Sequence, residues 1–266
     1  MKIGIFDSGI GGVSVLNEAL HRLPDQEYIF YADVDHVPYG IKTSEQIIGY
    51  ADQITASLID MGVDAVLIAC NTATAVAADH LRNKYSIPII GMEPAVKPAV
   101  QVAKESEGRV LVMATPVTIR ENKLHTLLER VDTEHRVDLL PMPSLVRFAE
   151  EELFDGKEVD TYIEEQIAVF DKSRYSELVL GCTHFNYFKP RLLKAFDNNI
   201  QMIDGNDGTV RHLAEILGLK ENPVDEVDLE NRDGRITYLG SGRPATEAEL
   251  QKITRLHKRL EFVRNI

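Results

Sequence analysis

Two segments of the chain, residues 65–72 and residues 177–184, share one pattern. In each, a short run of branched apolar side chains stops at a small residue and a cysteine follows, Cys70 in the first and Cys182 in the second. A polar residue comes next, Asn71 or Thr183. The pattern is typical of a buried parallel strand that delivers a side chain to the loop at its carboxyl end, where open α/β folds bind ligands. It predicts two similar halves, each offering one thiol to a shared crevice.

Strand-like apolar runs alternate with longer amphipathic runs along the chain, which predicts βαβ units and mainly parallel sheets. We expect strands at residues 2–6, 27–31, 64–69, 87–91, 109–113, 136–140, 177–181, 200–203 and 236–239. We expect helices at about residues 12–22, 44–61, 73–84, 95–104, 118–130, 144–154, 158–172, 188–196, 207–217 and 246–259. The predicted fold class is α/β, with two similar α/β domains and the active site in the cleft between them.

The length of 266 residues suffices for one large or two smaller domains. Because the two cysteine strands form a pseudo-repeat, we place one boundary after residues 90–94 and a second crossing near residues 204–206. The first domain is then residues 1–95 plus 207–266, with Cys70, and the second is residues 96–206, with Cys182. These crossing points rest partly on the family resemblance described below.

Charge and cysteine usage exclude several classes of protein. The 42 acidic and 29 basic residues give a net charge of −13, which argues against a nucleic-acid partner. The two cysteines do not indicate a disulfide framework, and the amino terminus begins directly with a strand. No run approaches the roughly 18 apolar residues of a membrane span. We therefore expect a cytoplasmic protein with reduced thiols and no membrane association.

Asp7 and Ser8 follow the first predicted strand and precede a glycine-rich turn. The spacing fits neither common nucleotide-phosphate motif, and Asp7 is either a functional carboxylate or a helix cap. Cys70 is either a small buried hydrophobe or a thiol whose pKa is lowered at a helix amino terminus.

His184 is either a core or surface histidine or, beside Cys182, a proton-transfer group. A zinc site formed by Cys70, Cys182, His184 and Asp7 would have suitable atoms but lacks the close ligand spacing of structural sites. Other polar residues have ordinary interpretations. Residues 37–40 form a turn, Thr115 and Thr118 are helix caps, and Glu150 belongs to a solvated charged face.

Taken together, four motifs resemble the glutamate racemase family, cofactor-independent members of the aspartate/glutamate racemase superfamily. They are residues 6–12, 37–40, 69–73 and 181–184, in the order typical of the family. The resemblance covers nearly the whole chain and weakens after about residue 200.

The resemblance implies that Cys70 and Cys182 are two acid/base residues on opposite faces of the substrate α-carbon. Asp7 would lie beside the first cysteine, and His184 and Glu150 beside the second. No pyridoxal phosphate or metal would be used. Family positions that hold the substrate correspond here to Asp7, Ser8, Pro38, Tyr39, Gly40, Asn71, Thr72, Thr115, Thr118, Thr183 and His184.

An amino acid α-proton is a weak acid, so the site has to stabilise the developing carbanion through donors aimed at the α-carboxylate. Burial without positive neighbours raises thiol pKa values, and the substrate ammonium is a candidate for ionising the attacking cysteine.

The chain departs from the family pattern at His36, Arg147, residues 185–186 and residues 204–206. The expected function is an isomerase that interconverts L- and D-glutamate and, as the resemblance implies, supplies D-glutamate for peptidoglycan, and so for cell-wall biogenesis and cell shape. A homodimer is expected on the same basis. The alternatives are an aspartate or broader-specificity amino acid racemase and a catalytically silent binding protein on this fold.

Overall fold

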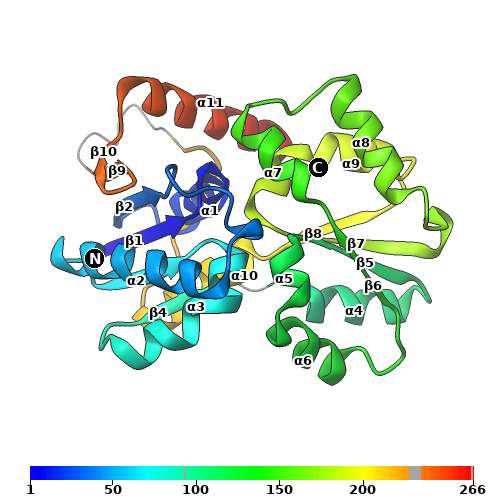
Figure 1. The fold of residues 1–266 in the computed structure, drawn as a ribbon, viewed down its shortest axis with the longest axis horizontal. Coiled ribbons are helices and arrows are strands. Elements are labelled where there is room, and N and C mark those ends of the chain that lie inside the picture. The colour runs from blue at the N-terminus through cyan, green and yellow to red at the C-terminus, as the bar shows by residue number, and fades with distance from the viewer. Residues whose placement is uncertain (93, 228–234, 265) are drawn as a thin grey trace.

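The computed structural model describes residues 1–92, 94–227, 235–264 and 266 of the chain. Its strands form two sheets, which lie side by side in Figure 1 with the helices packed around them. The predicted α/β class with mainly parallel sheets is confirmed. In the described residues, no helix is both long enough and apolar enough to cross a membrane.

The first sheet has the strand order β10-β9-β2-β1-β3-β4 and is parallel except for the β9–β10 hairpin. Its register places Asp7 beside Ala32 and Phe6 beside Ile68, so that the central strands end at one edge. The strands are β1 (Lys2–Asp7), β2 (Glu27–Ala32), β3 (Ala65–Ile68), β4 (Ile89–Gly91), β9 (Ile236–Gly240) and β10 (Arg243–Pro244).

The second sheet has the order β6-β5-β7-β8 and all its pairings are parallel. Ala114 pairs with Gly181, so Thr115 and Cys182 leave the sheet at the same edge. The strands are β5 (Arg109–Ala114), β6 (Val137–Pro141), β7 (Tyr175–Gly181) and β8 (Gln201–Asp204).

Helices connect the parallel strands, as βαβ units require. The two longest, α2 and α11, each begin with a capping box, formed by Thr43 with Gln46 and by Thr246 with Glu249. The α-helices are α1 (Val13–Arg22), α2 (Ser44–Asp60), α3 (Asn71–Lys84), α4 (Val96–Glu105), α5 (Pro116–Arg120), α6 (Asn122–Val131), α7 (Pro143–Glu150), α8 (Lys157–Ile167), α9 (Lys189–Ala195), α10 (Asn206–Leu217) and α11 (Glu247–Val263). Short 3-10 helices are η1 (Ile10–Gly12), η2 (Tyr39–Ile41), η3 (Lys172–Arg174) and η4 (Thr183–Phe188).

Four helices differ clearly from their predicted extents, and one of them, α11, ends at Val263 rather than near residue 259. The helix expected at residues 118–130 is two helices, because Glu121 adopts an extended conformation between α5 and α6. Helix α7 ends at Glu150 rather than near residue 154, and Glu152 has a positive φ of 56°. Helix α8 ends at Ile167 rather than near residue 172, where η3 begins. Local periodicity does not reveal these breaks.

One apolar cluster extends across both sheets. It contains Ile5 of β1, Leu111 of β5 and Leu256 of α11, all fully buried. Burial of such a side chain contributes about 1.5–3 kcal/mol. The two halves of the chain therefore share a core rather than touching only through polar surfaces.

The described strands of the first sheet fall within residues 1–95 and 207–266, and those of the second fall within residues 96–206. The domain boundaries themselves stay a prediction. Glu93, at the first predicted crossing, lies outside the described residues.

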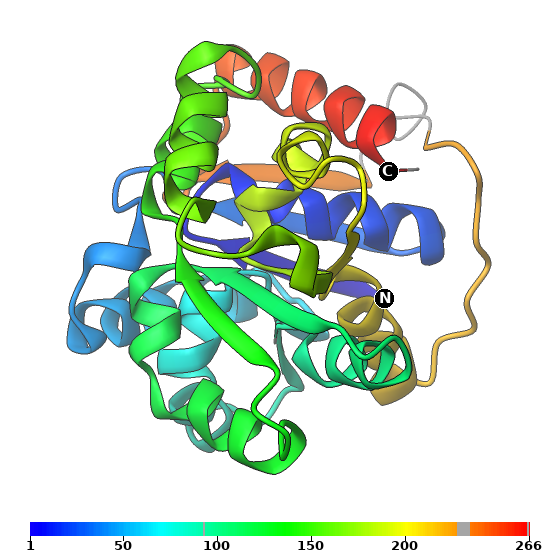
Figure 2. The same ribbon diagram turned by 90° about the vertical axis from the view of Figure 1, so that its right-hand side faces the viewer.

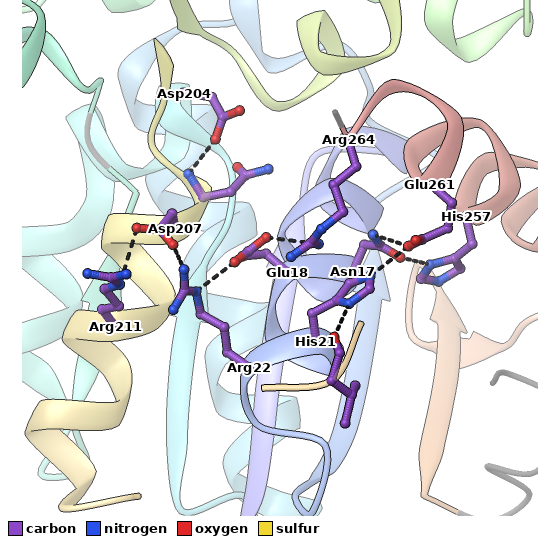
Figure 3. A network of polar contacts seen from close by, with 12 residues as sticks. Asn17, Glu18, His21, Arg22, Asp204, Asp207, Arg211, His257, Glu261 and Arg264 are labelled. Atoms are coloured by element: carbon purple, nitrogen blue, oxygen red, sulfur yellow. Dashed lines mark hydrogen bonds and ion pairs between the residues drawn. The ribbon is translucent and has the colours of Figure 1, made fainter. Parts of the chain in front are cut away.

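A network of polar side chains joins α1, α10 and α11 (Figure 3). His21 lies at its centre and is 1% exposed. Its Nδ1 is 2.8 Å from the Val224 carbonyl oxygen, and its Nε2 is 2.8 Å from Glu261 Oε1. Both ring nitrogens of His21 thus face acceptor groups, a carbonyl oxygen and a carboxylate oxygen. Asn17 donates to the same Glu261 oxygen at 2.8 Å, so the carboxylate ties α11 to α1.

Candidate active site

The two cysteines lie where the sequence pattern predicts, just beyond the carboxyl ends of β3 and β7. Both side chains are free thiols and both are buried, with exposed fractions of 5% for Cys70 and 6% for Cys182. Cys70 is the N-cap of α3, and its Sγ accepts a hydrogen bond from the Ala73 amide at 3.4 Å. Its Sγ also lies 3.8 Å from the Ser8 hydroxyl oxygen.

Cys70 is a weak acid in this environment. Burial raises the pKa of its thiol, and the negative charges of Asp7 and Cys182 raise it further. The Ala73 amide and the Ser8 hydroxyl lower the pKa, but by less, so the net direction is upward. The helix amide lowers the pKa of this thiol, as expected at a helix amino terminus, but desolvation outweighs it, and the net rise is the direction expected for burial without positive neighbours.

Cys182 has a histidine partner. His184 Nδ1 lies 3.8 Å from Cys182 Sγ, and His184 Nε2 lies 2.8 Å from Glu150 Oε1. Burial lowers the pKa of His184, but hydrogen bonds to Cys182 and Glu150 outweigh burial and raise it well above its ordinary value. Burial raises the pKa of Glu150, but the hydrogen bond and charge of His184, the Ile10 amide and the charge of Lys252 together outweigh burial, and the net direction is downward. At neutral pH this pair is an imidazolium and a carboxylate.

Asp7 connects the two halves of the site. Its Oδ2 accepts hydrogen bonds from the Gly12 amide at 2.6 Å and from the Thr183 hydroxyl at 3.3 Å. Burial raises the pKa of Asp7, since the carboxyl is completely enclosed. Its Oδ1 has no hydrogen-bond partner among the described residues. Asp7 thus caps the turn that follows it through Oδ2, and its buried Oδ1 is left as an acceptor without a hydrogen-bond partner among the described residues.

Three threonine hydroxyls meet between the halves. Thr72 Oγ1, from α3, lies 2.9 Å from Thr115 Oγ1 and 3.2 Å from Thr118 Oγ1. Thr115 is also the N-cap of α5 and accepts from the Thr118 amide, so its predicted capping role is confirmed. The same prediction is wrong for Thr118, which lies inside α5. The cluster places several hydroxyl groups at the start of two helices, where backbone amides also point outward.

The turn at residues 37–40 reaches the threonine cluster from the first half. A Cβ added to Gly40 would lie 3.0 Å from Thr115 Cβ, a tight contact, so glycine favours this close approach. Tyr39 is buried, and its hydroxyl donates to Asp33 Oδ2 at 2.5 Å. Burial and the charge of Asp33 raise the pKa of Tyr39, which stays a neutral phenol. Pro38 is the N-cap of the short helix η2.

Most of the predicted site residues contact one another through these bonds. Asn71 is buried at the first turn of α3 and lines a cavity of about 510 Å³ with Thr118 and Met92. The zinc arrangement has no counterpart in the described residues, where no three His, Cys, Asp or Glu side chains form a group suited to a metal ion.

Two residues in contact with the site were not identified from the sequence. Asp33 binds Tyr39 and also accepts from Ser241 at 3.1 Å. It follows β2 directly, as Asp7 ends β1, so its position at the carboxyl edge was a usable signal. Lys252 contacts Glu150 from α11 and had no such signal, since it is one of many charged residues on an amphipathic helix.

The departures from the family pattern also have structural roles. His36 Nδ1 is 2.8 Å from Asp33 Oδ1, and the His36 ring stacks on Tyr50 at 3.9 Å. Asn186 is buried and donates to the Thr183 carbonyl oxygen at 3.2 Å. Arg147 forms ion pairs with acidic side chains on the surface.

The chain is similar to known proteins in sequence and in overall fold. The family model described as Asp/Glu/Hydantoin racemase matches residues 7–213. A glutamate racemase from Lachnospira eligens is 48% identical over 267 residues, covering 100% of each chain. A crystal structure of glutamate racemase from Campylobacter jejuni has a TM-score of 0.78 and 27% identity, covering 97% of each chain. The Escherichia coli glutamate racemase structure, in complex with L-glutamate and the activator UDP-MurNAc-ala, has a TM-score of 0.80 and 26% identity, covering 97% of this chain and 94% of that one.

Proposed function

Because the chain belongs to the Asp/Glu/Hydantoin racemase family, we propose that it is an isomerase that interconverts L- and D-glutamate without a cofactor. The glutamate racemases that resemble it do so along their full length, which supports glutamate as the substrate. The proposed chemistry is removal of the α-proton by one cysteine and delivery of a proton to the opposite face by the other.

The observation that carries this proposal is the pair of buried thiols at the ends of β3 and β7. Cys70 and Cys182 come from different sheets, and the charge of Cys182 contributes to the raised pKa of Cys70. Two thiols that are close enough to interact electrostatically, each supplied by a different half of the chain, suit a substrate carbon held between them. A one-base reaction would not need the second thiol.

The raised pKa of Cys70 has two consequences. The thiol is protonated before substrate binds, and once ionised it is a stronger base than an ordinary thiolate. Asp7 has a buried oxygen without a partner, and a substrate ammonium group beside it would supply positive charge near Cys70. That cation would lower the pKa of Cys70 and promote its ionisation.

The second half of the site has its own source of positive charge. The His184 imidazolium, held by Glu150, can donate to the Cys182 sulfur when that cysteine is a thiolate. Ionisation of Cys70 therefore depends on the ammonium group of the substrate, whereas ionisation of Cys182 depends on the His184 imidazolium of the protein itself. The acid and base roles exchange with the handedness of the substrate.

The carbanion formed at the α-carbon requires donors directed at the α-carboxylate. We assign this role to Asn71, Thr72 and Thr183, with the amide groups that begin α3 and η4. Thr115, Thr118 and the turn at residues 38–40 lie at the threonine cluster and are assigned to the side-chain carboxylate, with Ser8 beside Cys70. In a buried site these hydrogen bonds are stronger than in water.

Three further properties are proposed from the family resemblance. The product D-glutamate would serve peptidoglycan synthesis and so the cell wall and cell shape, the protein would be cytoplasmic, and it would form a homodimer. Sedimentation equilibrium tests the last point, since a dimer has twice the 29.8 kDa of one chain.

The substrate is tested by incubating the purified protein with L-glutamate and no added cofactor, followed by chiral separation of the amino acid. We expect D-glutamate to accumulate until the enantiomers are equal, and D-glutamate to give the same end point. Aspartate in the same assay separates the alternatives. Turnover of aspartate but not glutamate would correct the substrate, and turnover of neither amino acid would contradict the proposed function.

A further inference from the structure

Three basic residues on one side of α11 face three acidic residues that begin at the end of α7. The basic residues Lys252, Arg255 and Arg259 are spaced three and four positions apart, which places them on one face of the helix. We call these three residues the basic stripe. Helix α11 follows β9 and β10 of the first sheet, whereas α7 follows β6 of the second sheet. Figures 1 and 2 both show α11 passing beside α7. The pairs are Lys252–Glu150, Arg255–Glu152 and Arg259–Asp155.

Lys252 differs from the other two because its partner belongs to the candidate site. Its Nζ donates to the Glu150 carbonyl oxygen at 2.6 Å and lies 3.6 Å from Glu150 Oε2. The first contact satisfies a carbonyl at the carboxyl end of α7, where no helical amide is available. The second places a cation beside the carboxylate. Both side chains are largely buried, with 23% of Lys252 and 18% of Glu150 exposed.

The oxygens of Glu150 have separate partners. Oε1 accepts from the Ile10 amide at 2.9 Å and binds His184 Nε2 at 2.8 Å. Oε2 faces Lys252. The positive charge of Lys252 contributes to the lowered pKa of Glu150. Lys252 is thus the outer member of a chain of contacts that runs through Glu150 and His184 to the Cys182 thiol.

Resting on the proposed racemase function, we propose that Lys252 is a positioning residue for the Cys182 half of the site. Its ammonium group holds Glu150 ionised and fixed in place, so that Glu150 keeps the proton on His184 and aims the ring at Cys182. The lysine does not contact the cysteine itself, and it acts from the C-terminal helix across the boundary between the two halves.

The physical basis is competition for one proton. In a buried pair, a neutral carboxylic acid with a neutral imidazole competes with the ion pair. A cation on the far side of the carboxylate favours the ion pair, because it stabilises the negative charge. Without Lys252 the pKa of Glu150 rises and the proton moves toward the carboxylate. The neutral imidazole then gives less support to a Cys182 thiolate.

Several other titratable groups lie near Glu150 and affect its charge. His184 and Tyr187 face it from η4, and Asp7 acts on it from β1. Glu249 of α11 lines the same small cavity as Glu150 and Lys252. Of these, Asp7 and Glu249 are acids and Tyr187 is a phenol with a raised pKa. Lys252 is therefore a cation beside Glu150 from outside the His184 pair, and its charge adds to the larger contributions of His184 and the Ile10 amide.

The test compares Lys252→Met with Arg255→Met. The matched control removes a bidentate pair with Glu152, at 2.7 and 2.8 Å, from the same stripe without touching Glu150. We expect Lys252→Met to lower kcat about tenfold or more, with a smaller effect on KM. The acid limb of its rate profile should move to higher pH by about one unit. Lys252→Arg should restore both, and Arg255→Met should stay within twofold of the wild type in kcat with an unmoved profile.

If both methionine variants lose the same stability and activity with unchanged pH profiles, the stripe is purely structural and the proposal is wrong. A second readout does not depend on turnover. In ¹⁵N-histidine-labelled protein near pH 7, His184, assigned by comparison with His184→Gln, should be doubly protonated in the wild type and neutral in Lys252→Met. A doubly protonated ring in both would overturn the role of Lys252. Failure of the racemase proposal is seen separately, as a wild-type protein that does not racemise glutamate.

Discussion

Cys70 and Cys182 are the same side chain in different electrostatic surroundings. Cys70 has a carboxylate, a hydroxyl and a helix amide around it, whereas Cys182 has an imidazolium. A site that removes a proton from either face of a carbon does not need identical groups on the two faces. It needs each group to be ionisable at the moment it acts as the base.

Cys70 should ionise only when substrate supplies positive charge. In the Cys182→Ser variant, Cys70 is the single thiol of the chain, so thiolate absorbance reports it alone. We expect its pKa to lie well above the usual range in the unliganded protein, because burial and Asp7 both raise it. Saturating glutamate should lower it. The same titration curve with and without glutamate would contradict a role for the substrate ammonium.

Gly11 leaves room for the Cys182 half of the site. A Cβ at this position would collide with His184 Nδ1 and Thr183 Oγ1. Gly11→Ala should therefore displace the ring from Cys182 and reduce kcat about 100-fold, the effect expected of a displacement near 1 Å.

The control for this change is Gly49→Ala, in the interior of α2 with nothing within 4 Å of the added atom. It should keep full activity and gain about 0.5–1 kcal/mol of stability from helix propensity. Equal activity in the two alanine variants would show that the packing of His184 against Gly11 does not matter.

At the scale of elements, the sequence predicted most strands and helices, because each is a run of one periodicity bounded by turn residues. The errors occur where distant residues decide the outcome. Helix α7 stops at Glu150, and the carbonyl oxygen of Glu150 accepts a hydrogen bond from Lys252, which is 102 residues away in sequence. The break at Glu121 separates α5, whose Thr115 and Thr118 meet Thr72 of another element, from α6. The hairpin strand β10 has only two residues and gives no periodic signal.

The packing of α11 onto α1 depends on Glu261 as well as on apolar side chains. Burial raises the pKa of Glu261, but hydrogen bonds from His21 and Asn17 outweigh it, so that the folded pKa lies below the ordinary value. Such a carboxylate stabilises the fold above its unfolded pKa, and this contribution is lost as pH falls through the folded pKa. Because solvent screens a side chain that is 37% exposed, Glu261→Gln should cost only up to about 1 kcal/mol at pH 7, and less below about pH 4.

Urea denaturation at the two pH values measures this difference. Glu215→Gln is the control, since Glu215 is 82% exposed and pairs only loosely with His212, at 3.5 Å. It should change stability by a few tenths of a kcal/mol. A cost for Glu261→Gln that is the same at both pH values would exclude the charge as its source.

At the scale of the whole molecule, the candidate site joins residues that are far apart in the chain. Asp7 meets Thr183 across 176 positions, and Ile10 meets Glu150 across 140. The sequence indicated both thiols and the strands that deliver them, because each lies in a local pattern. Tyr39, Glu150 and the threonines entered only through the family resemblance, since a turn, a charged helix face and a helix cap have common structural uses. Lys252 acts through Glu150, which no local pattern records, whereas the position of Asp33 directly after β2 was a signal that could have been used.

In the proposed reaction, the two thiols act on opposite faces of one carbon. The most direct test follows the wild-type reaction of L-glutamate in D₂O, stopped while most of the substrate remains, with separate analysis of both enantiomers for deuterium at the α-carbon. Because the second thiol carries a solvent deuteron, we expect the new D-glutamate to be deuterated and the remaining L-glutamate to keep its proton, with the mirror result from D-glutamate. Cys70→Ser and Cys182→Ser should each abolish racemisation. Deuterium entering the recovered L-glutamate as fast as D-glutamate forms, or D-glutamate that retains the original proton, would instead mean that one group serves both faces.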